Sequence, residues 1–423
     1  MSNPGSNYDV IVVGGGSGGV GAAVGSAQEG ARTLLIEAAG CLGGAASLRN
    51  VLTYCGVYTL GETPRRVVGG VAETVLDRLR DRGGVSGPHR FRGVFLVFDP
   101  ETNKLVLDEV CEEAGVEILF HSRLASARRD ENQIASIDVQ DHGGVRTLTA
   151  TAFIDATGEA DLAHLADASV RYGNDGAVNL ASLGTRFGGV PADVEITAQM
   201  VAAAVEDRQA AGVDVFTKKS SVVTRLPISG DLCMYVASAD YDPRDAASMS
   251  RAERSGRRQA QAYLAAIRGI EGAEHAYLVS TGPEFGTRES RHIDSVRRLC
   301  WADIEARRRF EDSVALGAWG AEWHDRTNYQ STLDLPPEGE PYEIPLRCLM
   351  SADTANLFAA GRTADGDRKA GAAIRVMGTA FVTGQAAGVA AAQLSGSGVV
   401  DPNLVRASLR AQNAMLDTDE SSG

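Results

Sequence analysis

Two groups of residues in this sequence have types and spacings suited to chemistry. The first is a glycine-rich turn, G-x-G-x-x-G at 14–19, which follows a short apolar run and precedes an acid, Glu37. Gly14, Gly16 and Gly19 allow a tight turn, a close approach of the backbone to a diphosphate, and close packing of a following helix, whose N–H groups favour the diphosphate. Glu37 is placed to bind ribose hydroxyls and would repel a 2′-phosphate. The pattern therefore predicts a βαβ unit that binds a dinucleotide.

The second group lies in the C-terminal half and consists of side chains that could bind an organic acid. A guanidinium group binds a carboxylate through two parallel hydrogen bonds. We therefore expect Arg288, Arg291 and Arg347 to clamp a carboxylate group of a substrate. The alternatives for Arg288 are an ion pair with Glu289 and a brace between two domains.

Composition narrows the function further. The chain of 423 residues has a net charge of −14, which disfavours nucleic acids as partners but not a small anionic substrate at a local arginine cluster. Residues 1–7 are polar without a basic residue, and no apolar stretch of about twenty residues occurs, so we expect neither a signal peptide nor a membrane partner. The six cysteines are dispersed without metal-binding spacing, which predicts reduced thiols in a cytoplasmic protein and no metal site. The oligomeric state stays open.

The elements that must position these residues begin with the βαβ unit. We expect a helix at 67–82 within an otherwise irregular segment 50–98, and a second helix at 99–113. The apolar positions of the second helix are Leu105, Leu107, Val110 and Cys111. A strand at 116–120 leads into an antiparallel meander of three short strands, after which the chain returns to the main sheet at 152–158.

A different style of sequence covers residues 165–335. It is more charged, with amphipathic helices at 196–210 and 246–267 and a β segment at 221–237. We assign it to a second domain that covers the cofactor. The sequence then returns to the first style, in which the small-residue segment 378–394 predicts a tightly packed buried helix.

Several of these segments together resemble one family of FAD-dependent oxidoreductases. The segment 286–293 (G-T-R-E-S-R-H-I) resembles a signature of that family, and 341–347, 360–362 and 375–391 resemble its C-terminal block in order and spacing. The resemblance implies an α/β fold with a Rossmann-like FAD-binding domain of the glutathione reductase type, an inserted β-meander, and a second α+β domain that forms a substrate cap. The FAD-binding domain would comprise 1–50, 99–165 and 341–423, and the cap would comprise 51–98 and 166–340.

An extended FAD needs separate sites for its adenosine, its diphosphate and its ring. The N-terminal motif would supply the first two, and the segment after Gly361, with the helix that begins near Gly378, would supply the third. The N-terminus of that helix would stabilise negative charge on the reduced ring. The expected FAD-binding residues are Gly14, Gly16, Ser17, Gly18, Gly19, Glu37, Ala38, Gly43, Gly44, Ala156, Thr157, Gly158, Gly361, Arg362, Gly378, Thr379 and Ala380.

Three positions depart from the family pattern. Arg362 follows Gly361 where many flavoproteins of this fold have an aspartate that contacts the ribitol. The loop 363–369 lacks a histidine that the family often has at this point. His292 stands where the signature has the second of two adjacent arginines.

A flavin dehydrogenase transfers a hydride to N5 of the ring and needs a base for the departing proton. Because imidazole titrates near neutral pH, His292 is the first candidate for this base, and His324 and Tyr342 are the alternatives. A covalent link from Cys41 or Cys55 to the flavin is a further alternative, although buried thiols usually only pack. The expected catalytic residues are His292, Arg288, Arg291, Tyr342 and Arg347.

These observations lead to one reading of the function and two rivals. A second glycine-rich motif after a strand is missing from the sequence, so we expect the substrate itself to reduce the flavin. The sequence predicts an FAD-dependent oxidoreductase, a dehydrogenase or oxidase, that oxidises a small organic substrate by hydride transfer to N5, next to a heteroatom or by C–C desaturation. The alternatives are a flavin-dependent monooxygenase and, from a different class, a flavin-fold scaffold that binds a partner without catalysis.

Overall fold

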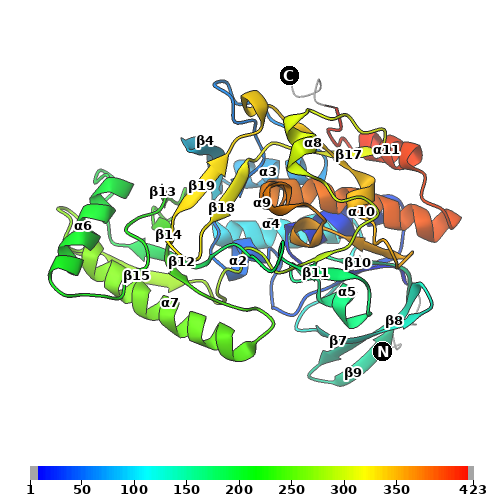
Figure 1. Cartoon of the computed structure of the whole chain (residues 1–423), viewed down its shortest axis with the longest axis horizontal. Helices are drawn as coiled ribbons and strands as arrows, with labels where there is room; N and C mark the ends of the chain where they lie inside the picture. Colours follow the sequence, from blue (N-terminus) through cyan, green and yellow to red (C-terminus); the bar gives the residue numbers. More distant parts are fainter. Residues whose placement is uncertain (1–7, 418–423) are drawn as a thin grey trace.

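A five-stranded parallel sheet organises the part of the molecule that contains the glycine-rich turn (Figure 1). In order across the sheet, its strands are β21 (Leu357–Ala359), β10 (Ala150–Asp155), β1 (Tyr8–Val13), β2 (Thr33–Ile36) and β6 (Glu117–Leu119). Helix α1 (Ser17–Gln28) connects β1 to β2, so the predicted βαβ unit and the parallel α/β class are confirmed. The computed structural model describes residues 8–417, and the segment 1–7, on which the signal-peptide expectation depends, lies outside this range.

Helices α1 and α10 (Met377–Ser397) pack against each other at very short distance. Cβ atoms on Gly384 and Gly388 would lie 2.0 and 2.1 Å from carbonyl oxygens of α1, so a larger residue does not fit at either position. The interpretation of 378–394 as a tightly packed buried helix is therefore confirmed. Within the described residues, no helix has the length and apolar character needed to cross a membrane.

The segment 50–98, predicted to be irregular apart from one helix, forms an antiparallel sheet instead. Its strands, in order across the sheet, are β3 (Thr53–Cys55), β5 (Gly93–Phe98) and β4 (Val85–Phe91). All six residues of β5 are buried, and a buried segment must pair its backbone N–H and C=O groups, which explains why strands form here. The predicted helix is present as α3 (Val71–Asp81).

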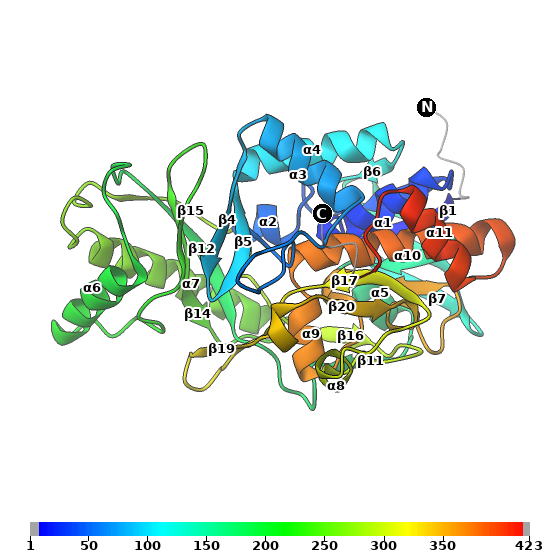
Figure 2. The same ribbon diagram turned by 90° about the horizontal axis from the view of Figure 1, so that it is seen from above.

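Helix α4 (Pro100–Glu113) lies beside α3 (Figure 2) and matches the second predicted helix. Leu107, Val110 and Cys111 are buried as predicted, but Leu105 is 51% exposed. The reason is geometric, because Leu105 lies two positions from Leu107 and therefore about 200° around the helix from it. An apolar side chain on this short helix was mistaken for part of its buried face.

The predicted meander is confirmed as a three-stranded antiparallel sheet. Its strands are β7 (Arg123–Asp130), β8 (Gln133–Asp141) and β9 (Gly144–Leu148). The chain then enters the parallel sheet through β10, and the short helix α5 (Asp161–Leu165) follows. The meander lies at the far side of the parallel sheet from the second part of the molecule (Figure 1).

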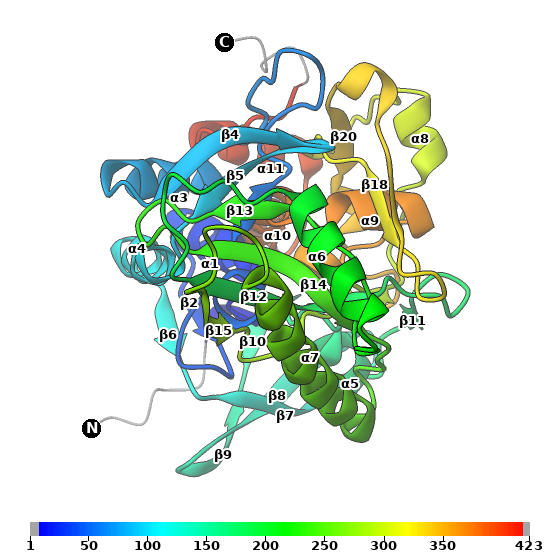
Figure 3. The same cartoon turned by 90° about the vertical axis from the view of Figure 1, so that its left-hand side faces the viewer.

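A four-stranded antiparallel sheet organises that second part (Figure 3). In order across the sheet, its strands are β13 (Val223–Arg225), β14 (Leu232–Ala239), β12 (Ala181–Gly188) and β15 (Tyr277–Thr281). The two predicted amphipathic helices are present as α6 (Ala198–Ala210) and α7 (Ala246–Ile267), on the face turned away from the parallel sheet (Figures 1 and 3). This region has a buried core of its own around Phe187, Met234 and Tyr263. The boundaries of the two domains stay predictions.

Short elements, most of them from the C-terminal half, complete the molecule. They are α2 (Ala45–Leu48), β11 (Val170–Tyr172), β16 (Arg291–Ile293), α8 (Trp301–Glu305), β17 (Ser313–Gly317), β18 (Ala321–His324), β19 (Ser331–Asp334), β20 (Tyr342–Pro345), α9 (Arg368–Ile374) and α11 (Pro402–Ala411), with 3-10 turns at Pro337–Gly339, Leu346–Cys348 and Gly361–Thr363. The β18–β19 hairpin runs along the border between the two parts (Figure 1).

Candidate active site

A cavity of about 700 Å³ lies where the two parts of the molecule meet, and we call it the central cavity. Both parts contribute to its walls. Cys55 of β3 and Phe95 of β5 line it, as do Tyr235 of β14 and His324 of β18. Met377, the first residue of α10, also borders it, so the start of this helix and the second sheet share one enclosed space.

Helix α10 begins at this cavity with an uncapped first turn. Val376 precedes the helix, and no side chain accepts a hydrogen bond from its first N–H groups. A Cβ on Gly378 would lie 2.6 Å from the carbonyl oxygen of Cys55, so the first turn packs directly on β3. The Oγ1 of Thr379 is buried without a hydrogen-bond partner. Free N–H groups and an unsatisfied hydroxyl suit a polar ring edge that carries negative charge.

The glycine-rich turn has the geometry that its motif predicts. Gly14 has a φ of +104°, and a Cβ there would lie 2.4 Å from the carbonyl oxygen of Ala156. A Cβ on Gly19 would lie 1.7 Å from the carbonyl oxygen of Gly14. The first contact requires the left-handed turn out of β1, and the second presses α1 onto that turn, so the two glycines hold the strand and the helix together.

The start of α1 offers unused polar groups of the kind that bind a diphosphate. Gly16 precedes the helix, and no side chain caps it. The nearest atom to a Cβ on Gly16 would be the Cα of Gly44 at 3.9 Å, which leaves room on this side of the turn. The Oγ of Ser17 is buried without a hydrogen-bond partner. These residues therefore fit a diphosphate at the helix N-terminus.

Glu37, at the end of β2, connects the turn to the following loop. Its Oε2 accepts a hydrogen bond from Gly15 N at 2.7 Å, and its Oε1 accepts one from Ala39 N at 2.7 Å. An ionised carboxylate has about four acceptor positions, so two remain for hydroxyl groups. The carboxylate thus keeps the capacity expected for a ribose contact while it holds its own loop in place.

Arg362, which stands in place of the more usual aspartate, turns toward Glu159. Its guanidinium donates to Glu159 Oε1 at 2.8 Å and to the carbonyl oxygen of Thr287 at 2.8 Å. Arg49 lies 3.5 Å from the same carboxylate oxygen. The other oxygen of Glu159, Oε2, is buried without a hydrogen-bond partner. A carboxylate is therefore present in this region after all, supplied by a different segment of the chain.

The expected cofactor residues gather in two places. Most surround the start of α1. Gly16 forms an isolated β-bridge with Gly43. Gly18 lies close to Gly361, and Gly14 lies close to Ala156. Glu37 and the exposed Ala38 lie at the end of β2, while Thr157 and Gly158 follow Ala156, and Gly158 contacts Arg362. The second group consists of Gly378, Thr379 and Ala380 at the start of α10.

Glu322, which is partly exposed, and the buried His324 form a polar pair on β18. His324 Nε2 lies 3.3 Å from Glu322 Oε1, and His324 Nδ1 is buried without a partner. Burial, followed by the charge of Arg288, lowers the pKa of His324 to about 3. Burial alone would raise the pKa of Glu322, but His324 and the neighbouring arginines hold it below its ordinary value. At neutral pH the pair is therefore a neutral imidazole beside a carboxylate.

Two further cationic side chains line the cavity. Arg288 donates to the carbonyl oxygen of Leu180 and to Ser182 Oγ, at 2.5 and 2.9 Å. Burial, followed by the charge of Arg375, lowers the pKa of Arg288 to about 10. Burial, followed by the charge of Arg288, lowers the pKa of Lys218 to about 7. The Arg288–Glu289 ion pair considered above is not formed, because Arg288 turns into the cavity and Glu289 turns away from it.

The comparison with known families fits this geometry. The family model of the FAD dependent oxidoreductases matches residues 9–412. The chain belongs to this family. FAD is its cofactor, as the resemblance of the sequence motifs implies, and the uncapped helix starts with the unpartnered Ser17 and Thr379 hydroxyls fit that group.

Among solved structures, BexE has a similar fold at low sequence identity. The flavoenzyme chain is 14% identical to BexE, a protein studied for oxidation during BE-7585A biosynthesis, with a TM-score of 0.52 over 96% of this chain and 66% of that one. A geranylgeranyl bacteriochlorophyll reductase-like protein of Thermoplasma acidophilum is 13% identical, with a TM-score of 0.47 over 98% and 90% of the two chains. A p-nitrophenol 4-monooxygenase from Pseudomonas putida is 11% identical, with a TM-score of 0.46 over 95% of this chain and 84% of that one. None of the curated proteins compared with the chain matches it.

In this FAD-dependent oxidoreductase, His292 lies away from the central cavity. Its Nδ1 lies 3.0 Å from the carbonyl oxygen of Ala364, and its Nε2 lies 3.3 Å from Glu289 Oε1. The side chain is buried, and both ring nitrogens have protein partners. The structure therefore places His292 outside the cavity lining with both ring nitrogens beside protein groups, and its role as a base stays a prediction.

Three other expected catalytic residues also lie outside the cavity lining. Arg291 pairs with Asp161 at 3.1 Å. Arg347 is half exposed and binds both carboxylate oxygens of Asp312 at 2.9 Å. Tyr342 is buried and donates to the carbonyl oxygen of Trp319. Of the three arginines expected to form a carboxylate clamp, the structure brings only Arg288 to the cavity.

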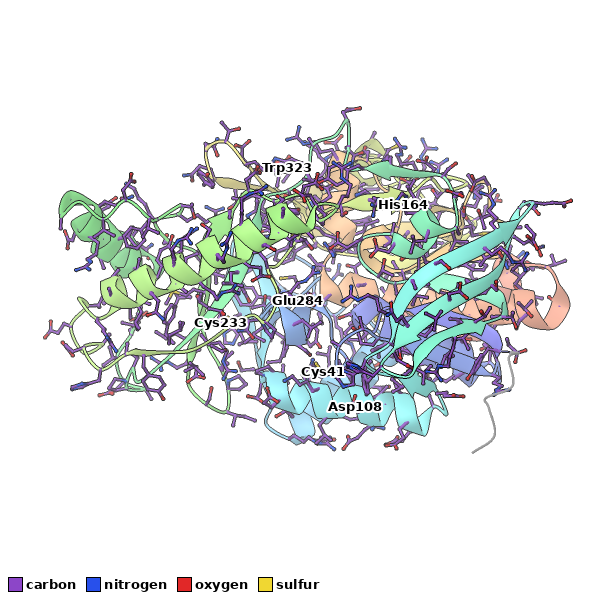
Figure 4. The ribbon with its side chains drawn as sticks, turned by 90° about the horizontal axis from the view of Figure 1, so that it is seen from below. Cys41, Asp108, His164, Cys233, Glu284 and Trp323 are labelled. Carbon is purple, nitrogen blue, oxygen red and sulfur yellow. The ribbon has the colours of Figure 1, made fainter. Side chains whose placement is uncertain are left out.

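The cysteines are free thiols, as predicted. Cys55 lines the central cavity, and burial raises its pKa to about 12, so it is protonated at neutral pH. Figure 4 shows Cys41 beside α4, near Asp108, and Cys233 in the part of the molecule that contains β14. This wide spacing agrees with the dispersed positions in the sequence.

Sequence reasoning missed three cavity residues, Lys218, Glu322 and Arg375. Glu322 and His324 are two positions apart on a strand, so their side chains share one face, and that period-two spacing was a usable signal. Arg375 stands in a segment already recognised as part of the family block. Lys218 gave no signal, because an adjacent pair of lysines in a loop is ordinary for a surface segment.

Proposed function

We propose that this flavoenzyme oxidises a small organic substrate in the central cavity, by dehydrogenation next to a heteroatom or by desaturation of a C–C bond. One observation carries the proposal: the first turn of α10, at Met377, borders the same cavity as Glu322 and His324. In the glutathione reductase type of arrangement that we propose, the flavin ring lies at this helix start. A substrate in the cavity would then lie between the ring and the polar pair.

The residues expected to hold FAD would act at two helix starts. The N–H groups at the start of α1, with Ser17 Oγ, would bind the diphosphate, and Glu37 would accept from ribose hydroxyls. The start of α10, with Thr379 Oγ1, would hold the polar edge of the ring. FAD, when bound, accepts a hydride from the substrate at N5 of its ring.

His324 is the base in this proposal, in place of His292. Glu322 Oε1 lies 3.3 Å from His324 Nε2, and we assign the proton of the neutral ring to that nitrogen. This leaves Nδ1, which has no protein partner, to accept the proton that leaves the substrate. The low pKa of His324 keeps the ring neutral in the empty cavity, and a substrate that brings negative charge toward Arg288 would raise it.

Aromatic side chains would keep water away from the reacting atoms. Phe95 and Trp319 are buried in the cavity wall, and Tyr235 lines it with its hydroxyl accepting from Leu52 N at 3.0 Å. Exclusion of water strengthens the electrostatic interactions among the charged groups of the cavity. We propose that the predicted cap, 51–98 with 166–340, serves this purpose.

The visible absorption spectrum of the purified protein, followed by anaerobic mixing with small alcohols, amines and acids, tests this function. We expect flavin bands that a substrate bleaches without oxygen. His324→Gln should slow the bleaching about 100-fold with unchanged flavin content, since loss of a general base costs that much or more. His164→Gln, a change at an exposed histidine of α5, should leave it unaffected.

Three outcomes would contradict the proposal. Substrate conversion that requires oxygen and leaves the flavin oxidised under anaerobic conditions would indicate a monooxygenase. A protein that stays colourless after addition of FAD would indicate a scaffold. Equal rates for His324→Gln and the unchanged protein would remove His324 from the role of base.

A further inference from the structure

Cationic side chains outnumber carboxylates around the central cavity, although the whole chain carries a net charge of −14. Among the described residues that line the cavity, seven are arginine or lysine and one, Glu322, is a carboxylate. The charge around the cavity is therefore positive, opposite in sign to the charge of the whole chain. A positively lined cavity in a negative protein concentrates anions at that place.

Most of these cations already have protein partners. The ion pairs are Arg49 and Arg362 with Glu159, Lys219 with Glu206, and Arg375 with Glu322, at 2.7 to 3.7 Å. Arg92 is exposed at the rim and donates to Ser331. Lys218 and Arg288 remain, and within the described chain neither has a carboxylate within ion-pair distance.

The backbone directs Lys218 into the cavity. Tyr263, on helix α7, donates to the carbonyl oxygen of Lys218 at 2.6 Å and accepts from Lys218 N at 3.2 Å. Both backbone groups are thereby fixed to the core of the second sheet, at a position where Lys218 lines the cavity. The charge of Arg288 acts on the ammonium strongly enough to be the second cause of its lowered pKa. The two cations therefore lie near each other, and both are only partly exposed.

Lys218 and Arg288 are neighbouring cations, and the carboxylate that acts on both, Glu322, lies outside ion-pair distance and is already paired with Arg375. Such an arrangement is unfavourable in a partly buried cavity. Each cation has lost part of its hydration, and each repels the other. A ligand that carries negatively charged oxygen would relieve both costs, and the guanidinium and ammonium groups are donors that suit it. A neutral ligand would leave the repulsion in place.

We propose that the substrate carries an anionic oxygen group, a carboxylate or a phosphate, which Lys218 and Arg288 bind together, and an apolar body that rests against Phe95, Tyr235 and Trp319. This inference rests on the proposed function, in which the central cavity is the substrate site. It defines a class of substrate, namely apolar organic acids or phosphate esters, rather than free sugars, amines or neutral alcohols. In the cavity, the acid group would be held by Lys218, in the loop at 216–222, and by Arg288.

Calorimetric titration of the FAD-loaded protein with three matched probes tests the inference: phenylacetate, benzylphosphonate and neutral phenylacetamide. We expect at least one of the two anions to bind about 30-fold or more tightly than the amide, since an unpaired partner in a buried charge pair costs that much. The tighter anion distinguishes a carboxylate site from a phosphate site. Equal binding of both anions and the amide, or no saturable binding of either anion at millimolar concentration, would overturn the inference.

Substitutions at two adjacent lysines provide the matched control. Lys218→Met should abolish the preference for the anion over the amide, and Lys218→Arg should retain most of it. Lys219→Met should change neither, because the Lys219 ammonium pairs with Glu206 and its side chain is 60% exposed. If Lys218→Met keeps the preference, or if Lys218→Arg loses it with its flavin spectrum intact, the inference is wrong.

The same titration separates this inference from the proposed function. A change in the visible flavin bands on probe binding supports a cavity that adjoins the ring, whichever probe causes it. The ratio of anion to amide affinity, compared between the unchanged protein and Lys218→Met, reports on the proposed anion site. Flavin bands that respond equally to all three probes would leave the proposed function standing and overturn the substrate class.

Discussion

The turn at 14–19 and the central cavity differ in how they present polar groups. At the turn, the groups are N–H donors of one continuous segment, fixed by contacts that leave no space for a Cβ on Gly14 or Gly19. In the cavity, they are the ends of long side chains, such as Lys218 and Arg288, that come from separate segments. A site made from backbone is set by the fold itself, whereas a site made from side chains can change one residue at a time. We therefore expect substitutions to have all-or-none effects at the turn and graded effects in the cavity.

The largest effect is expected at the turn. Gly19→Ala would place a Cβ 1.7 Å from the carbonyl oxygen of Gly14, a distance that neither backbone segment can relieve. We expect little folded protein and no bound flavin, with a loss of stability above about 3 kcal/mol. Gly396→Ala, where the new Cβ would meet open space, should leave stability unchanged or raise it by about 0.5–1 kcal/mol.

Flavin absorbance of the soluble fraction and denaturant unfolding measure both variants. A stable Gly19→Ala protein that binds flavin would contradict the expected all-or-none effect, because the turn would then accept a substitution as the cavity does.

A smaller effect is expected beneath the cavity, at Glu289. Its carboxylate accepts from Asn179 N and Asn179 Nδ2 at 2.9 and 3.1 Å, and Asn179 Oδ1 in turn accepts from His324 N at 2.8 Å. Glu289→Ala should cost about 3 kcal/mol, since it leaves buried donors without partners. The folded fraction should keep its flavin but lose turnover, because the backbone of His324 loses its support.

Urea unfolding with parallel flavin measurement tests this expectation, and Glu112→Ala, at an exposed position of α4, is the control. If Glu289→Ala lost flavin in proportion to turnover, the turn at 14–19 and the central cavity would not respond separately to substitution.

The smallest effect is a pH dependence of stability that arises in the cavity. His324 has a pKa of about 3 in the folded chain and 6.5 in the reference state. Between these values the unfolded chain binds more protons, so stability falls as pH decreases below about 6.5, by up to about 1.4 kcal/mol per unit. The free energy of unfolding, measured at about pH 7.5, 6 and 5, should fall more steeply for the unchanged protein than for His324→Asn. If the free energy of unfolding changed equally with pH in both proteins, His324 would not be buried in its neutral form.

The elements near the turn were predictable because their signals are local. The strand, the glycines and α1 follow one another within 8–28, and each requirement is met by neighbours in sequence. The strands of 50–98 were missed because they form only when the segment is buried. In the sequence, Gly83 and Gly84 look instead like part of an exposed loop. Leu105 was misplaced because a single apolar residue does not define a helical face.

The cavity was predictable only in part, for a different reason. Arg288 and His324 were named as candidates, yet nothing in the sequence distinguishes His324 from His292, since both are short-range neighbours of an acid and become buried. The difference is that His324, which lines the cavity, has one buried ring nitrogen without a partner, whereas both ring nitrogens of His292 have protein partners. Such a difference arises when distant segments meet, and so it appears only in three dimensions.

In the FAD site that we propose, the close packing of α1 on α10 would also fix the distance between the two helix starts that hold the cofactor. Gly384 lies against Gly18, so α10 extends about six residues further toward its N-terminus than α1 does, or ~9 Å at 1.5 Å per residue. The interlocked glycines prevent the two helices from sliding along each other. A molecule must therefore match this fixed offset to engage both helix starts at once. In the proposed site, a mononucleotide such as FMN, which lacks the adenosine half, would leave Glu37 without its ribose partner, so we expect the fixed offset to favour the full dinucleotide.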